Sequence, residues 1–134
     1  AVLVFHDVTV NLNLARELNH QASHDALTGI PNRREFERRL AECLGRPREP
    51  GTQDIVCYLD LDQFKVVNDT CGHVAGDELL RQVVGLLREQ LRTSDLLARL
   101  GGDEFGLILF ACPLEQALAL HTLQASCFAK YRDC

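Results

Sequence analysis

The residues of this chain best suited to chemistry are two adjacent carboxylates, Asp103 and Glu104, which follow a pair of glycines. One apolar run precedes the glycines at 96–98, and another follows the carboxylates at 107–110. Apolar runs on either side of a glycine-containing turn predict a β-hairpin with the carboxylates at its tip. Taken alone, this acidic tip is equally compatible with an ordinary solvated turn.

A second acidic pair makes a catalytic role the better interpretation. The apolar run 55–61 predicts a strand that leads into Asp60 and Asp62. Because strand side chains alternate in direction, we expect these two carboxylates on one face. A strand end and a hairpin tip that converge would supply the oxygen ligands that Mg²⁺ requires and usually shares with phosphates. The two acidic pairs together therefore predict phosphoryl transfer.

The elements that must position these carboxylates are several helices and a small sheet. Hydrophobic periodicity and turn residues predict helices over 10–22, 33–45, 63–71, 76–91 and 114–120, a surface loop over 45–53, and a strand over 54–61. Phe36, Leu40 and Leu44 form the expected apolar stripe of the second helix, and Asp77 is placed to cap the start of the fourth. This order of elements predicts an α/β (α+β) sandwich, with helices packed against a central sheet.

The composition is that of one ordinary globular domain. The chain has 134 residues, of which 46% are hydrophobic and 25% charged, enough for a modest core. A net charge of −5 argues against nonspecific nucleic-acid binding, which needs a basic surface. The six cysteines include no C-x-x-C pair, which favours reduced thiols. Reduced thiols predict a cytoplasmic location. No apolar stretch approaches the roughly 20 residues of a membrane span, and an anchor upstream of the chain is left open.

Four motifs in order resemble GGDEF-domain diguanylate cyclases, which join two GTP molecules into cyclic di-GMP. The signature itself is Gly101-Gly102-Asp103-Glu104-Phe105. The supporting motifs are the entry motif 25–34, the metal strand and phosphate loop 60–65, and the guanine-binding segment containing Asn68-Asp69, Gly72-His73 and Gly76-Asp77. The resemblance covers roughly residues 23–120. It implies a ferredoxin-like core, similar to the polymerase palm and to nucleotide cyclases.

The resemblance also implies a metal centre for Mg²⁺ or Mn²⁺. Its ligands would be the carboxylates of Asp60 and Asp103 and the backbone carbonyl of Leu61, with Glu104 beside the metals. In the two-metal scheme, one cation activates the attacking ribose 3′-hydroxyl and the other neutralises the leaving pyrophosphate. Either Glu104 or Asp103 would accept the 3′-hydroxyl proton, and the sequence does not choose between them.

The remaining substrate contacts are assigned by the same resemblance. Phe64 and Lys65 would offer backbone N–H groups to the β- and γ-phosphates, and Gly101 and Gly102 would let the backbone approach a phosphate closely.

Asn68 and Asp77 would bind the guanine base, since a carboxylate and an amide can match its donors and acceptors. Alternatively, Asn68 only ends a turn and Asp77 only caps a helix. Asp25, Asn32 and Arg33 are interpreted as structural ties around the entry turn.

Arg92-Thr93-Ser94-Asp95 precedes the hairpin where many members of this family have an R-x-x-D site for product inhibition. An arginine fork and a carboxylate can bind the two edges of guanine in cyclic di-GMP. The alternative is an arginine at a helix C-terminus followed by a turn aspartate.

Three parts are expected along the chain. Residues 1–9 resemble the closing strand of a PAS sensor domain, residues 10–22 a linker helix, and residues 23–134 a GGDEF domain that is incomplete at its C-terminus. The expected partners are GTP, a second protomer in a homodimer, cyclic di-GMP as product and feedback ligand, the upstream sensor and a fused phosphodiesterase domain. The second functional hypothesis is a noncatalytic module that binds GTP or cyclic di-GMP.

Overall fold

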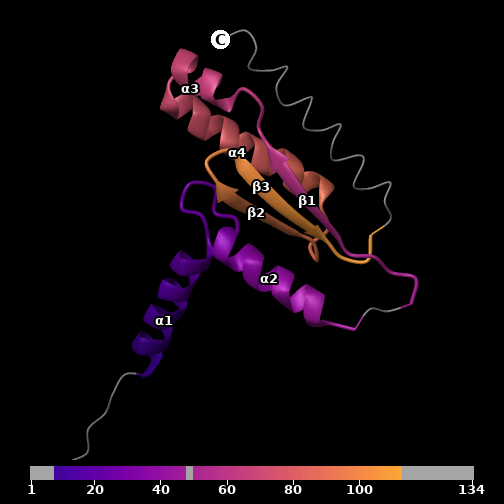
Figure 1. Ribbon diagram of the computed structural model, residues 1–134. Coiled ribbons are helices and arrows are strands. Elements are labelled where there is room, and N and C mark those ends of the chain that lie inside the picture. Colours follow the sequence, from indigo (N-terminus) through magenta and orange to yellow (C-terminus); the bar gives the residue numbers. More distant parts are fainter. Residues whose placement is uncertain (1–7, 48–49, 113–134) are drawn as a thin grey trace, which may run out of the picture.

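The computed structural model describes residues 8–47 and 50–112, which form four helices and three strands (Figure 1). In chain order they are α1 (Val8–Ser23), α2 (Arg33–Gly45), β1 (Ile55–Asp60), α3 (Phe64–Cys71), α4 (His73–Gln90), β2 (Leu96–Gly101) and β3 (Glu104–Leu109). The predicted bounds of α2 are therefore confirmed. The helix expected over 114–120 lies outside the described residues.

The strands form one antiparallel sheet with the order β1-β3-β2. β2 and β3 are the two arms of the predicted hairpin, joined by the turn at Gly102 and Asp103. β1 lies on the other side of β3, with Ile55 opposite Leu109 and Asp60 opposite Glu104. The end of β1 is thereby placed beside the tip of the hairpin, although more than 40 residues separate them in the sequence.

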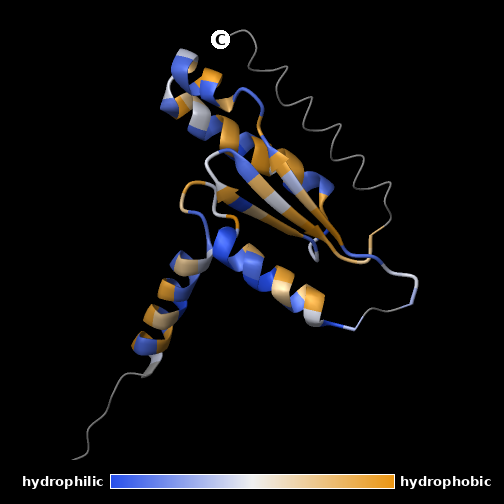
Figure 2. Ribbon diagram, in the orientation of Figure 1, coloured by the Kyte–Doolittle hydropathy of each residue, from blue (hydrophilic) through white to orange (hydrophobic). Residues whose placement is uncertain are grey.

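The strands β2 and β3 are largely buried on both faces, which explains their apolar runs, whereas β1 alternates between half-buried and exposed residues. On one face, Phe105, Leu107 and Leu109 join the core formed with α4. On the other face, Ile108 packs with residues of α2 and β2. Figure 1 shows α2 and α4 on opposite sides of the sheet, and Figure 2 shows the apolar character of the strands between them. The predicted sandwich is therefore present in the described part of the chain.

α2 contacts the sheet through Phe36 and Leu40, as expected, but through Cys43 in place of Leu44. Phe36 is 2% exposed and Cys43 is 8% exposed, whereas Leu44 is 73% exposed. The prediction for Leu44 is wrong because position 43, seven residues after Phe36, returns to the same side of the helix. Phe36 lies directly over Gly106 of β3, where a Cβ atom would be 2.6 Å from the phenyl ring.

Two boundaries near the acidic residues also differ from expectation. α4 begins at His73, so Asp77 lies inside the helix and does not cap it. The cap position is Gly72, whose positive φ of 87° suits glycine. Because glycine has no capping side chain, the start of this helix has no signal in the sequence. β1 ends at Asp60, so strand alternation does not extend to Asp62, which lies in the following turn.

α1 extends away from the body of the domain (Figure 1). It begins two residues before the predicted linker helix, so residues 8 and 9 are helical and the predicted strand is wrong there. Residues 1–7 of that strand lie outside the described residues. The large apolar side chains of α1, namely Val10, Leu12, Leu14 and Leu18, are each more than half exposed. Among the described residues, no helix has the length and apolar character needed to cross a membrane.

Candidate active site

The candidate site is assembled where β1 ends beside the hairpin tip. The last register pair of the β1–β3 ladder joins Asp60 to Glu104. One residue further on, the N–H of Leu61 donates to the carbonyl oxygen of Asp103 at 3.1 Å. These backbone contacts bring the two predicted acidic pairs together, as the sequence analysis expected.

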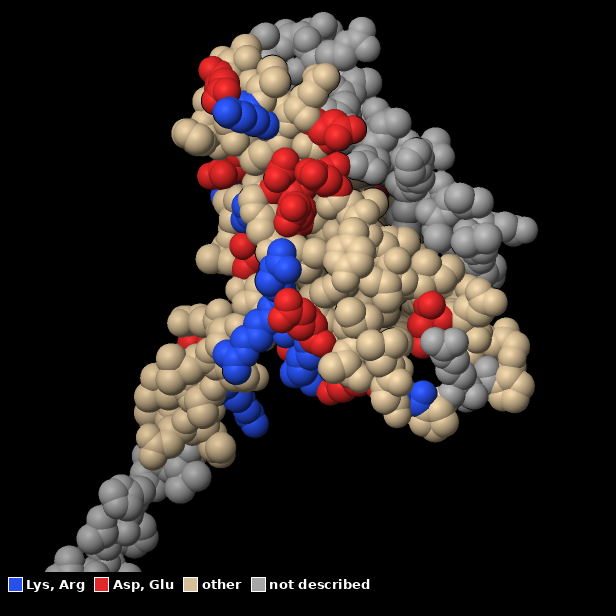
Figure 3. All heavy atoms as spheres, viewed as in Figure 1, with Lys and Arg blue, Asp and Glu red and all other residues tan. Residues whose placement is uncertain are grey.

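The carboxylates are close enough to influence one another. The pKa of Asp60 is raised above its ordinary value, first by the negative charge of Asp103. Partial loss of hydration and a side-chain hydrogen bond with Asp103 raise it further, and Glu104 and Asp62 add smaller repulsions. Figure 3 shows acidic side chains gathered on this face, next to a group of Lys and Arg side chains. Such a concentration of like charge would be relieved by a bound cation.

The donor set suits a divalent cation shared with a phosphate. Asp60 and Asp103 supply carboxylate oxygens, and the carbonyl of Leu61 lies beside them in the chain. That carbonyl already accepts the N–H of Phe64 at 3.3 Å, but a carbonyl oxygen has a second lone pair. Within residues 8–47 and 50–112, no three His, Cys, Asp or Glu side chains are grouped to hold a metal by themselves. Two carboxylates with one carbonyl form a smaller set, which Mg²⁺ completes with water and phosphate oxygens.

The predicted phosphate loop is a tight turn into α3. Gln63 has a positive φ of 60°, and the N–H of Phe64 closes the turn onto Leu61. The N–H groups of Phe64 and Lys65 were both expected to bind the phosphates, and that of Phe64 is already hydrogen-bonded to Leu61. The N–H of Lys65 lies in the first turn of α3, where helical N–H groups have no partner within the helix.

The predicted guanine-binding residues lie on two helices that pack together. Asn68 belongs to α3 and Asp77 to α4, and each is partly buried. Because α4 begins at His73, the capping alternative for Asp77 is removed. The backbone carbonyl of Asn68 accepts the N–H of Gly72, which ends α3. Asn68 thus ends α3 through its backbone, which is the structural alternative predicted for this residue.

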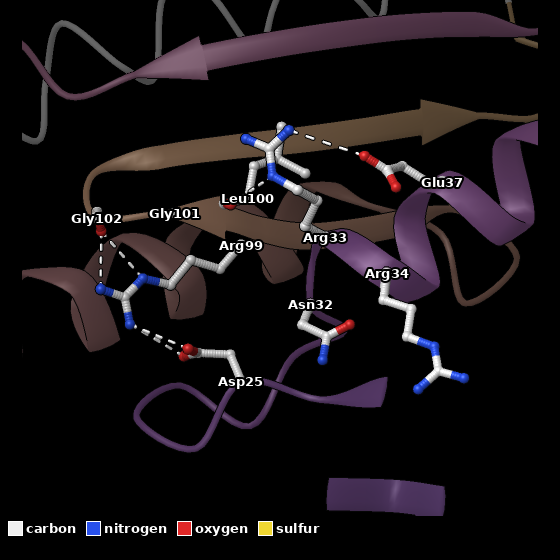
Figure 4. Close-up of a pocket in the computed structure, with 9 residues that line it drawn as sticks. All are labelled: Asp25, Asn32, Arg33, Arg34, Glu37, Arg99, Leu100, Gly101 and Gly102. Carbon is white, nitrogen blue, oxygen red and sulfur yellow. Dashed lines mark hydrogen bonds and ion pairs between the residues drawn. The ribbon is translucent and has the colours of Figure 1, made fainter. Parts of the chain in front are cut away.

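The entry turn is tied to the hairpin by Arg99, a residue to which the sequence analysis gave no role. Arg99 Nη1 donates to both carboxylate oxygens of Asp25, at 3.1 and 3.2 Å. Its Nε and Nη2 donate to the carbonyl of Gly102, at 3.0 and 2.8 Å. Figure 4 shows the Arg99 guanidinium between these two partners. A lone arginine in an apolar strand beside the glycine pair was the available sequence signal.

Asp25 is held as a carboxylate by these contacts. Burial acts to raise its pKa, but hydrogen bonds from the backbone and side chain of Thr28 and from Arg99, together with the charge of Arg99, lower it overall. Asn32 caps α2 by accepting the N–H of Glu35 at 3.1 Å. The Nε of Arg33 donates to the carbonyl of Leu100 at 3.0 Å. The predicted structural roles of Asp25, Asn32 and Arg33 are therefore confirmed.

Two hollows flank the hairpin tip. A cavity of about 540 Å³ is lined by residues of the entry turn, α2 and the hairpin, including Asp25, Arg34 and Gly102 (Figure 4). A second cavity of about 320 Å³ is lined by residues that include Asp60 and Glu104. Arg33 borders both cavities, and its Nη2 lies 3.6 Å from Glu104 Oε2. Both side chains of that pair are more than half exposed, so it adds little stability.

The predicted inhibitory pair closes the turn between α4 and β2. Arg92 Nη2 lies 3.1 Å from Asp95 Oδ1, and the Asp95 side chain is only 4% exposed. Asp95 also accepts the N–H groups of Arg92 and Phe110, at 3.0 and 3.2 Å. Arg92 further donates to the carbonyl of Phe110. The alternative role, a structural turn, is therefore present, and the exposed part of Arg92 remains accessible to a ligand.

Known proteins share both the sequence pattern and the fold. The family described as "Diguanylate cyclase, GGDEF domain" matches residues 22–133. The chain is 48% identical over 122 residues to "Probable diguanylate cyclase DgcE" of Escherichia coli, covering 91% of the chain and 11% of that protein. It is 44% identical over 108 residues to "Cyclic di-GMP phosphodiesterase PdeB" of Shewanella oneidensis, covering 81% of the chain and 12% of that protein. The chain thus spans about a tenth of the length of these two relatives.

A solved structure shows the same arrangement of elements. The coiled coil and GGDEF domain of DgcB from Caulobacter crescentus, in complex with c-di-GMP, superposes with a TM-score of 0.72 at 30% identity. The match covers 83% of the chain and 60% of that structure.

Proposed function

The chain belongs to the GGDEF-domain family of diguanylate cyclases, and we propose that it condenses two GTP molecules into cyclic di-GMP. The observation that supports this most directly is the proximity of Asp60 and Asp103, which the β1–β3 register and the Leu61–Asp103 hydrogen bond produce. Because both carboxylates are present at this position, a catalytic domain is favoured over a noncatalytic one.

The reaction is the attack of a ribose 3′-hydroxyl on the α-phosphate of a second GTP. A new P–O bond forms, the bond between the α-phosphorus and the bridging oxygen breaks, and pyrophosphate leaves. The proton of the hydroxyl passes to Glu104 or to Asp103. Repeating the step with the exchanged partners closes the ring, so each protomer of a homodimer would hold one GTP.

Members of this family generally use divalent metal ions, and the residues of this chain fit one. Asp60 and Asp103 would hold Mg²⁺ or Mn²⁺ with the Leu61 carbonyl, and Glu104 would lie beside it. The bound cation would supply positive charge at the reacting phosphate. The protein itself fixes the two carboxylates through backbone hydrogen bonds, so little rearrangement is needed when substrate arrives.

The remaining assigned residues would orient the nucleotide. Asp77 and the amide of Asn68 would bind the guanine edge from α4 and α3. Phe64, Lys65 and the glycine pair Gly101-Gly102 would border the triphosphate. The exposed positions of both glycines, which leave room for a phosphate, support this assignment.

Regulation would act through the two ends of the domain. We propose that α1 is the linker helix that pairs with a second copy, which its exposed leucines support. We place the domain at residues 23–134, with a PAS-like sensor before the linker and a phosphodiesterase domain as a further fused partner. The free cysteines of the described residues support a cytoplasmic location. Arg92 and Asp95 would bind the product and inhibit further synthesis.

The alternative function is a noncatalytic module that binds GTP or cyclic di-GMP within a longer protein. The similarity to PdeB, a phosphodiesterase, favours keeping this alternative. The two functions differ in turnover: a module would bind nucleotide without releasing pyrophosphate.

The test is synthesis of cyclic di-GMP from GTP and Mg²⁺ by the full-length protein. Asp60→Ala and Asp103→Ala should each reduce turnover by about a hundredfold or more, because the metal ligands are lost. Thermal melting should change little, since Asp60 is exposed and its removal leaves no cavity. Glu89→Ala, which removes an exposed carboxylate at the end of α4, is the matched control and should retain full activity. Near-wild-type turnover in either site variant would refute the metal assignment.

A further inference from the structure

Gly76 is a buried glycine at the contact between α4 and α3. A Cβ atom at this position would lie 1.8 Å from Oδ1 and 2.9 Å from Cγ of Asn68. It would also lie 3.4 Å from Cζ of Phe64, an ordinary contact distance. Both distances to Asn68 are shorter than a Cβ atom approaches another heavy atom. A methyl group at position 76 and the present position of the Asn68 amide therefore exclude each other.

The group that would yield is the amide and not the helix. Asn68 is attached through two rotatable bonds, and its amide is the far end of the side chain. A clash with such a group is relieved by rotation, whereas a clash with backbone would separate α3 from α4. Alanine also has a higher helix propensity than glycine, which favours the substituted helix. Gly76→Ala is thus expected to displace Asn68 while the domain still folds.

We propose that Gly76 is a positioning residue for guanine recognition. Because position 76 has no side chain, the Asn68 amide can occupy this space and adopt its binding orientation. This inference rests on the proposed function, in which Asn68 and Asp77 bind the base. Asp77 directly follows Gly76, so the contact of Gly76 with Asn68 adjoins both residues to which the proposed function assigns the guanine. The close approach at Gly76 determines how near the Asn68 amide lies to α4, the helix that carries Asp77.

The same helix provides a matched control. Gly85 also lies within α4, and a Cβ atom there would meet no heavy atom within 4 Å apart from the adjoining backbone of its own helix. Gly85→Ala introduces the same methyl group with the same gain in helix propensity and without any contact to Asn68. A difference between the two variants therefore reports the contact with Asn68 and not the loss of a glycine.

The experiment measures KM and kcat for GTP and the melting temperature in the full-length protein. Gly76→Ala should raise KM roughly three- to tenfold, the loss expected for one hydrogen bond, with a smaller change in kcat. Its melting temperature should stay near or above that of the wild type. Gly85→Ala should raise the melting temperature and leave KM unchanged.

A double variant separates positioning from a general packing effect. If Gly76 acts through Asn68, then adding Gly76→Ala to Asn68→Ala should raise KM no further. An additional rise in that background, or equal KM values for Gly76→Ala and Gly85→Ala, would overturn the inference while leaving the proposed function intact. A wild-type protein that neither binds nor turns over GTP would instead overturn the proposed function, and the inference with it.

Discussion

At the scale of single residues, Arg99 determines how the hairpin tip is held. Its guanidinium connects the carboxylate of Asp25 to the carbonyl of Gly102. The Arg99–Asp25 pair is largely buried, with side chains 17% and 21% exposed. A partly buried, hydrogen-bonded pair orients its partners better than a surface pair does. Arg99 thus fixes the peptide that immediately precedes the catalytic candidate Asp103.

The ionisation of Asp25 predicts a pH-dependent contribution to stability. Because folding lowers the pKa of Asp25, its contribution is present above the ordinary pKa and is lost as the pH falls through the lowered value. Asp25→Asn should therefore lower the melting temperature at pH 7, and the difference from wild type should shrink below about pH 4. Melting curves from pH 7 to pH 3 test this. Asp69→Asn, at an exposed position of α3, is the control. A difference that is equal at every pH would contradict the role of the charge.

Arg92 pairs with Asp95 in a structural turn and is also partly exposed, and we expect its removal to weaken product inhibition. Arg92→Ala should leave the initial rate of synthesis near the wild-type rate, while cyclic di-GMP accumulates past the wild-type plateau. A modest loss of stability should accompany it, since Arg92 also donates to the Phe110 carbonyl. Progress curves with and without added cyclic di-GMP measure the effect, with Arg88→Ala at an exposed site of α4 as the control. Equal inhibition of both variants would leave Arg92 and Asp95 with their structural role alone.

At the scale of elements, the packing of α2 on the sheet depends on one glycine. Phe36 covers Gly106, and a Cβ atom there would lie 2.6 Å from Cε2 and 2.9 Å from Cζ of the ring. Unlike Asn68, Phe36 is 2% exposed and part of a packed core, so it has little room to move. The same change from glycine to alanine should therefore affect stability at position 106.

Gly106→Ala should destabilise the domain by about 1–3 kcal/mol, the usual cost of overpacking. The measurement is the free energy of unfolding in urea. Gly45→Ala, with nothing within 4 Å of the added Cβ, should have no comparable cost. Combining Gly106→Ala with Phe36→Leu should recover part of the loss, because the smaller side chain makes room. Wild-type stability of Gly106→Ala would show that α2 shifts freely on the sheet.

At the scale of the whole molecule, the described sheet has β1 at one edge and β2 at the other. β1 carries the metal candidate Asp60, and its outer edge has no partner strand within residues 8–47 and 50–112. An unpaired edge exposes N–H and C=O groups and invites association. The matches to the two relatives compared above cover 11% and 12% of their length.

We therefore expect the 134-residue chain to associate through the outer edge of β1, which has no partner strand among the described residues. Size-exclusion chromatography over a range of protein concentrations measures the oligomeric state. A monomer at every concentration would contradict this expectation.

Much of this protein follows from its sequence because the deciding interactions are local. The bounds of α2 follow from Asn32, a capping side chain, and from the spacing of apolar residues. The hairpin follows from two apolar runs around adjacent glycines. The motifs around Asp60 and Asp103 were sufficient to predict a site at the junction of β1 and the hairpin.

Only the tertiary structure decided which residues work together across the chain. The start of α4 at Gly72 has no capping side chain, so Asp77 was mistaken for the cap. The pairing of Arg99 with Asp25 joins residues 74 positions apart, and the contact of Asn68 with Gly76 depends on how α3 crosses α4. A one-dimensional pattern records which side chains are present and at what spacing. It does not record the separation of packed elements, which here decides whether one methyl group fits.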